Sequence, residues 1–65
     1  MASRVDMAYT VVPLRVGKKI LPANTSITVA RTSKKWIITV ILGEDGGLRF
    51  TMNPISAERC IEIVM

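Results

Sequence analysis

The residues best suited to chemistry in this 65-residue chain are its cations. The segment RTSKKW (31–36) places three of them beside the chain's only tryptophan. If this segment forms a hairpin turn, Arg31 and Lys35 lie on opposite sides of it, and like charges that close cost stability unless an anion relieves them. Lysine and arginine are also the side chains that neutralise nucleic-acid phosphates. The predicted phosphate-binding residues are Arg15, Lys18, Lys19, Arg31, Lys34, Lys35 and Arg49.

The aromatic residues offer fewer contacts for a nucleic acid. Tyr9 and Trp36 are the candidate residues for stacking on bases, because Phe50 alternates with core residues in its predicted strand. Trp36, however, shares one face of its predicted strand with Ile38 and Val40, which favours a place in the core. We therefore expect Trp36 to face inward, while the neighbouring cations face water or phosphate. Binding that rests on phosphate contacts is strongly salt-dependent and reads little sequence.

Charge is distributed unevenly along the chain, whose net charge is +4. Residues 1–36 carry seven cations and one anion, and residues 37–65 carry two cations and four anions, which gives +6 and −2. This asymmetry indicates an acidic partner, either nucleic acid (DNA or RNA) or an acidic protein surface. An alternative role for Lys34 and Lys35 is protection against aggregation, because they precede the most apolar segment, WIITVIL (36–42).

Most classes of active site are excluded by residues that the chain lacks. It has no histidine and one cysteine, Cys60, so histidine-dependent triads and Cys/His zinc sites are not available. The segment GEDGG (43–47) has neither the lysine of a P-loop nor enough oxygen ligands for a metal, and it suits a hairpin loop. We expect a protein that is not an enzyme and uses no cofactor or metal. With no signal peptide and no apolar run near 20 residues, roughly the length of a membrane span, we expect it to be soluble, cytoplasmic and without membrane contact.

The elements that must position these residues are predominantly strands. We expect a flexible N-terminus (residues 1–8) and one small β-rich domain (residues 9–65). Residues 9–16 alternate like a strand, and Pro13, which has no N–H, places that strand at a sheet edge. Three further strands are predicted, at 26–31 with Ile27 and Val29 inward, at 35–42 as a central strand covered on both faces, and at 48–53 with Arg49 outward.

The last eleven residues permit two interpretations. In the first, a short helical turn near residues 55–59 precedes a final strand at 60–64, because Ile61, Ile63 and Val64 are β-branched. In the second, Ser56 caps a helix over 56–64, which would give an α+β fold with an antiparallel sheet backed by a C-terminal helix. The first order, carried by SITVARTSKKWIITVIL, GEDGGLRF and PISAERCIEIV, resembles a five-stranded antiparallel SH3-like barrel. This resemblance covers about residues 19–64 and leaves strand 9–16 as an extra edge strand or an oligomer contact.

The sequence favours a non-enzymatic nucleic-acid-binding protein that contacts the phosphate backbone through a basic hairpin and strand surface. The alternative is a protein-interaction module (an inhibitor, adaptor or assembly subunit) that uses edge strand 9–16 to pair with a partner. A homodimer or higher homo-oligomer is also expected, because a chain this short has a thin margin of stability on its own.

Overall fold

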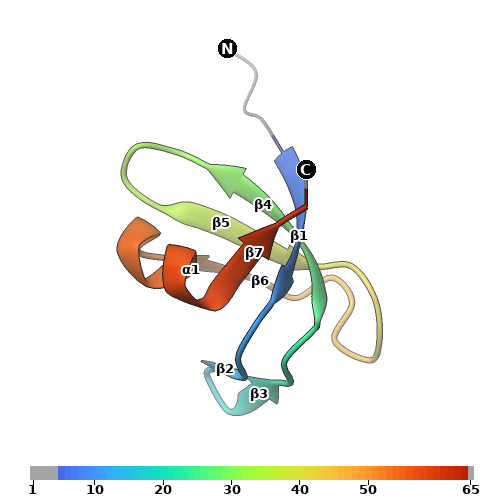
Figure 1. The fold of residues 1–65 in the computed structure, drawn as a ribbon. Helices are drawn as coiled ribbons and strands as arrows, with labels where there is room; N and C mark the ends of the chain where they lie inside the picture. The colour runs from blue at the N-terminus through green and yellow to red at the C-terminus, as the bar shows by residue number, and fades with distance from the viewer. Residues whose placement is uncertain (1–4, 65) are drawn as a thin grey trace.

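The computed structural model describes residues 5–64 and shows a mainly β protein (Figure 1). Its elements are β1 (Val5–Thr10), β2 (Leu14–Val16), β3 (Lys19–Leu21), β4 (Ser26–Arg31), β5 (Trp36–Val40), β6 (Arg49–Met52), α1 (Pro54–Cys60) and β7 (Ile61–Ile63). Five strands form an antiparallel sheet in the order β6-β5-β4-β1-β7, and β2 and β3 form a separate hairpin. Among the described residues the edge strands β6 and β7 do not pair with each other, so the sheet's hydrogen bonds do not close a barrel.

The first strand differs most from the sequence prediction. β1 lies inside the sheet, paired with β4 on one side and β7 on the other. The predicted edge strand 9–16 is therefore wrong: its first residues end β1, and residues 14–16 form β2 of the hairpin. Pro13 lies between these two strands, where no sheet partner needs its missing N–H. Residues 5–8, predicted to be flexible, belong to β1 instead, and residues 1–4 lie outside the described residues.

β1 lacks a clear alternating pattern because polar residues occupy two of its inward positions. Thr10 is fully buried, and its hydroxyl donates to the carbonyl of Pro22 at 3.0 Å and accepts from the amide of Thr25 at 3.0 Å. Asp6 lies on the same side of the strand and pairs with Arg31. Both polar groups have hydrogen-bond or ion-pair partners that are far away in the sequence. These partners stabilise the strand although its sequence looks irregular.

The core lies on one face of the sheet, which we call the inner face. As predicted, Ile27 and Val29 of β4 point inward and are fully buried. Trp36, Ile38 and Val40 of β5 also point inward, and Ile38 pairs with Val29 across the two strands. The prediction that this strand is covered on both faces is wrong, because Ile37 and Thr39 on the other side are only half-buried. Leu42, the last residue of the predicted strand 35–42, is exposed because β5 ends at Val40.

The C-terminal segment follows the first of the two predicted interpretations. Asn53 caps α1, with its Oδ1 accepting from the amide of Ile55 at 2.9 Å, and Pro54 occupies the first turn, where it needs no N–H partner. The helix ends where Ile61 takes an extended backbone and begins β7. The alternative helix over 56–64 is therefore wrong. Ala57 is fully buried and joins α1 to the core cluster of the inner face. No helix in the described part of the chain has the length and hydrophobicity to cross a membrane.

Candidate nucleic-acid interface

The turn between β4 and β5 is held in shape by Thr32. Its amide donates to the carbonyl of Lys35 at 3.0 Å, and its hydroxyl donates to the same carbonyl at 2.6 Å. The hydroxyl oxygen also accepts from the amides of Lys34 at 3.4 Å and Lys35 at 3.1 Å. These contacts fix the backbone from which two adjacent, exposed lysines project. We call Lys34 and Lys35, with the backbone that carries them, the lysine turn.

Arg31, beside the lysine turn, already has an anionic partner. Its Nη2 donates to Oδ2 of Asp6 at 2.7 Å, and both side chains are partly exposed. The guanidinium also lies over the ring of Trp36, its cross-strand partner, with Cζ at 5.8 Å from the ring centroid. The expected crowding of Arg31 against Lys35 is thus relieved within the protein. Among the predicted phosphate-binding residues near this turn, Lys34 and Lys35 take part in neither ion pair that the structure shows among residues 5–64.

Trp36 is a core residue, as its alternation predicted. Only 6% of its surface is exposed, and Arg31 lies over its ring, so in this structure it offers no free face for a base. Tyr9, the other candidate for stacking, lies on the opposite face of the sheet with 36% of its surface exposed. It pairs with Ser26 on one side and Glu62 on the other.

A second group of predicted cations lies at the other end of β4. Arg15, Lys18 and Lys19 belong to the β2–β3 hairpin, which leads into the start of β4, whereas the lysine turn follows its end (Figure 1). Lys19 Nζ is 2.7 Å from Oδ1 of Asp45, and this hydrogen bond and charge raise the pKa of Lys19. Six residues of extended strand span about 20 Å, so one small contact does not include both groups. Arg49 is separate again, on the outer side of β6 opposite Thr39.

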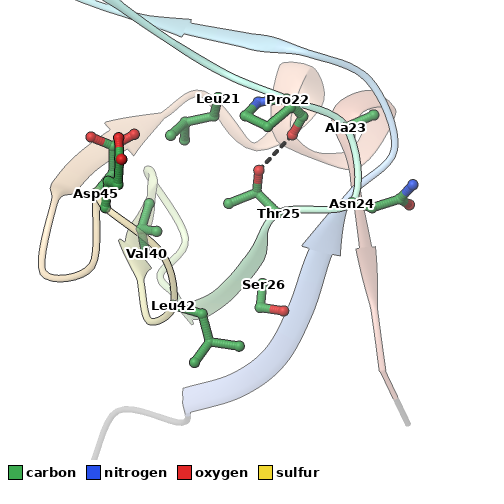
Figure 2. Close-up of a pocket in the computed structure, with 11 residues that line it drawn as sticks. Leu21, Pro22, Ala23, Asn24, Thr25, Ser26, Val40, Leu42 and Asp45 are labelled. Atoms are coloured by element: carbon green, nitrogen blue, oxygen red, sulfur yellow. Dashed lines mark hydrogen bonds between the residues drawn. The ribbon is translucent and has the colours of Figure 1, made fainter.

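The loops at the hairpin end border an open cavity of about 410 Å³ (Figure 2). Its walls are residues 21–26 and the segment 42–45 with Val40, and Thr25 closes one side by donating its hydroxyl to the carbonyl of Pro22. Glu44 and Asp45 line it, and none of the predicted phosphate-binding residues does. Two carboxylates disfavour an anionic ligand, so this cavity does not suit a phosphate. No group of three metal-ligating side chains lies together within residues 5–64.

The uncovered side of the sheet, which we call the outer face, carries a feature that the sequence analysis missed. Val5, Met7 and Tyr9 of β1 all point to it and are exposed, and Val64 beyond β7 lies next to Met7. Recognising residues 5–10 as one strand would have identified these residues, but residues 1–8 were predicted to be a flexible N-terminus and Tyr9 was assigned to a strand at 9–16. No protein-family model, curated protein or solved structure matches this chain, so its function is argued from its own geometry.

Proposed function

We propose that the protein is a non-enzymatic nucleic-acid-binding protein that contacts the phosphate backbone through the lysine turn. The observation that carries the proposal is the pair of adjacent, exposed lysines on a turn whose backbone is fixed by Thr32. Because that backbone is already ordered, binding does not have to order it. Both ammonium groups are free of the two ion pairs seen among the described residues, so phosphate would not compete with an internal carboxylate.

The expected contact reads phosphates more than bases. Trp36 is buried, and Tyr9 lies on the outer face, away from the inner side to which Trp36 and Arg31 belong. Phosphate contacts release counterions from the nucleic acid, which makes affinity fall steeply with salt and leaves little sequence preference. Lys18 and Arg15, at the hairpin end, would add attraction at long range without sharing the contact. Arg31 would hold Trp36 and Asp6 in place beside the turn.

An SH3-like barrel is the finer description that we infer for the fold. In support, the strand order puts the first and last strands side by side and places a short helix directly before the last one. The β2–β3 hairpin would then be an elaborated loop between the first two sheet strands, and β1 would be part of the barrel rather than an addition to it. Small β-barrels of several kinds bind nucleic-acid strands through cationic surfaces.

The proposal is tested by comparing charge reversal at the two ends of β4. Lys34→Glu with Lys35→Glu should remove most binding to labelled single-stranded and duplex oligonucleotides, measured by anisotropy at several salt concentrations. Losing two phosphate contacts should lower the slope of log affinity against log salt by roughly 1.4 for single strands and 1.8 for duplex. The matched control, Arg15→Glu with Lys18→Glu, makes the same change in net charge at the hairpin. Equal losses in the two variants would contradict a contact centred on the lysine turn, and so would a wild-type protein that binds neither oligonucleotide.

A protein-interaction module is the second candidate, although strand 9–16 cannot serve as its docking edge. The observation that favours it is the row of exposed apolar side chains on the outer face. An acidic protein surface would be the expected partner of the lysine turn in that case. An unlabelled polyanion that competes with a protein partner would distinguish nucleic-acid binding from protein binding, but this experiment needs a known protein partner. The oligonucleotide titration therefore comes first.

A further inference from the structure

The outer face carries an apolar ridge along β1. Val5, Met7 and Tyr9 are 61%, 54% and 36% exposed, and alternation places all three on this side of the strand. Val64, which is 54% exposed, extends the ridge sideways, because its amide donates to the carbonyl of Met7 at 2.8 Å. Neighbouring exposed apolar residues on one sheet face mark a surface that associates with another.

Beside the ridge, the outer face is hollowed. A depression of about 390 Å³ is lined by Val5 of the ridge and by residues of β4, β5 and β6, namely Thr28, Ala30, Ile37, Thr39 and Arg49. Small residues cause it, because Ala30 lies between Val5 and Ile37 in the register and Thr28 lies between Met7 and Thr39. The outer face therefore combines an apolar ridge on β1 with an adjoining depression that Val5 also borders.

The charged residues of the outer face lie on its two opposite edges, with the cation on one edge and the anion on the other. Arg49 lies on β6 and Glu62 on β7, which are the two opposite edges of the sheet. Both side chains are exposed and both alternate to the outer side. Within the sheet strands of a chain with a net charge of +4, this face thus carries one cation and one anion.

We propose that the outer face binds a second copy of this chain, with a two-fold axis parallel to the strands. That rotation exchanges the two sides of the sheet about β4, so β1 of one copy lies over β5 of the other, and β7 lies over β6. Met7 and its neighbours then enter the depression of the partner copy, and Glu62 faces Arg49 twice, once in each direction. Facing sheets generally pack about 10 Å apart with nearly aligned strands, and the proposed axis aligns the strands of the two copies.

The register places the charge pairs within reach. Met7, Thr28, Thr39 and Arg49 form one row across the sheet, and Glu62 is in the adjacent row with Tyr9 and Ser26. Rows on one face are two residues apart, or about 6.6 Å along the strand, which an arginine side chain spans. The same axis keeps both lysine turns at one end of the dimer. A chain of this length also gains the apolar burial that a small single core does not supply.

The mass of the protein in solution tests the proposal. Sedimentation equilibrium of the wild type from micromolar to millimolar concentration should give twice the monomer mass of 7.2 kDa. Met7→Lys should weaken the dimer at least tenfold and leave a folded monomer, since Met7 is already half-exposed. The control is Ile20→Lys, which is 64% exposed on the β2–β3 hairpin, outside the proposed contact, and should leave the dimer unchanged. A wild type that stays monomeric at millimolar concentration would overturn the proposal, and so would a Met7→Lys dimer as strong as the wild type's.

Charge reversal tests the direction of the axis. Arg49→Glu and Glu62→Arg should each weaken the dimer by about tenfold, since each change alters two pairs. The double variant restores opposite charges in both pairs and should recover most of the lost affinity. Both residues are exposed, so the monomer fold is retained in all three proteins. A double variant with no recovery would overturn this arrangement of the two copies.

Discussion

The two faces of the sheet differ in what their residues do. On the inner face Ile27, Val29 and Ile38 are completely buried, and Ala57 of α1 belongs to the same core cluster. On the outer face Val5 and Met7 are more than half exposed, although they are as apolar as the core residues. Hydrophobicity alone therefore does not tell which side of a strand is the core. The face that packs against the rest of the chain is the core: Leu14 and Leu21 of the β2–β3 hairpin and Ala57 of α1 join the inner-face cluster. The apolar residues on the other face are available for contact.

The largest difference between the faces should appear when one charge is added to each. Val40→Asp places an unpaired carboxylate on the inner face, where Val40 is 1% exposed. The cost is on the order of 5 kcal/mol, comparable to the roughly 3–10 kcal/mol that holds a chain of this size folded. We expect an unfolded protein by circular dichroism. The neighbouring control, Thr39→Asp, points to the outer face opposite Arg49 and should stay folded. A folded, soluble Val40→Asp protein would show that the inner face is assigned wrongly.

Removing a threonine hydroxyl from each face should give a smaller difference in stability. Thr10→Val removes the buried hydroxyl that joins the carbonyl of Pro22 to the amide of Thr25, and leaves both groups without that partner. The free energy of unfolding should fall by about 1–3 kcal/mol, as measured by urea denaturation. Thr51→Val makes the same change at an exposed outer position of β6 and should alter stability by less than about 0.5 kcal/mol. Equal losses would mean that the Thr10 hydroxyl does not stabilise the fold.

The N-cap of α1 tests how much this helix contributes to the stability of the inner face. Asn53→Ala removes the side-chain oxygen that accepts from the amide of Ile55, and should lower stability by about 1 kcal/mol. Asn53→Asp keeps an acceptor at the same place and should retain most of the stability. Thermal unfolding of the wild type and the two variants measures their order of stability. If both variants were equally destabilised, the cap would not act through this hydrogen bond.

The smallest effect should come from the exposed ion pair between Lys19 and Asp45. The pKa of Lys19 is raised above 10.5 by its hydrogen bond to Asp45 and by that carboxylate's charge. A raised lysine pKa means that the pair stabilises the fold below pH 10.5 and that this contribution is lost as the pH rises through the raised value. The melting temperature of Lys19→Gln should lie slightly below that of the wild type at neutral pH, and the gap should close in alkali. The control, Lys18→Gln, should show no such convergence.

Sequence patterns predicted the elements whose residues alternate without interruption. β4 and β6 follow their alternation, and Trp36, Ile38 and Val40 of β5 lie on one face as expected. The last strand was predicted from the β-branched residues near the end, whereas the Asn53 cap and Pro54 that begin the short helix were not recognised in the sequence. β1 was missed because Asp6 and Thr10 occupy inward positions, and the partners that make this acceptable are between 12 and 25 residues away.

The candidate site was predictable only in part for the same reason. The seven predicted phosphate-binding residues look equivalent in the sequence. In the structure, however, Arg31 pairs with Asp6 and Lys19 pairs with Asp45, across 25 and 26 residues. Folding therefore separates cations that have internal partners from the exposed Lys34 and Lys35. Folding also places the lysine turn and the cations of the β2–β3 hairpin at opposite ends of β4. The net charge of the chain does not show this separation. The outer ridge could not be inferred without β1.

One titration tests the central claim, that the protein contacts phosphates through the lysine turn while the inner face stays closed. A labelled single-stranded oligonucleotide is titrated with wild-type protein at low and at moderate salt, with anisotropy and Trp36 fluorescence recorded together. We predict that anisotropy rises at low salt, that affinity falls steeply as salt increases, and that Trp36 emission hardly changes because its ring is in the core. No rise in anisotropy at low salt would contradict nucleic-acid binding. Strong quenching of Trp36 would contradict a contact that leaves the inner face closed.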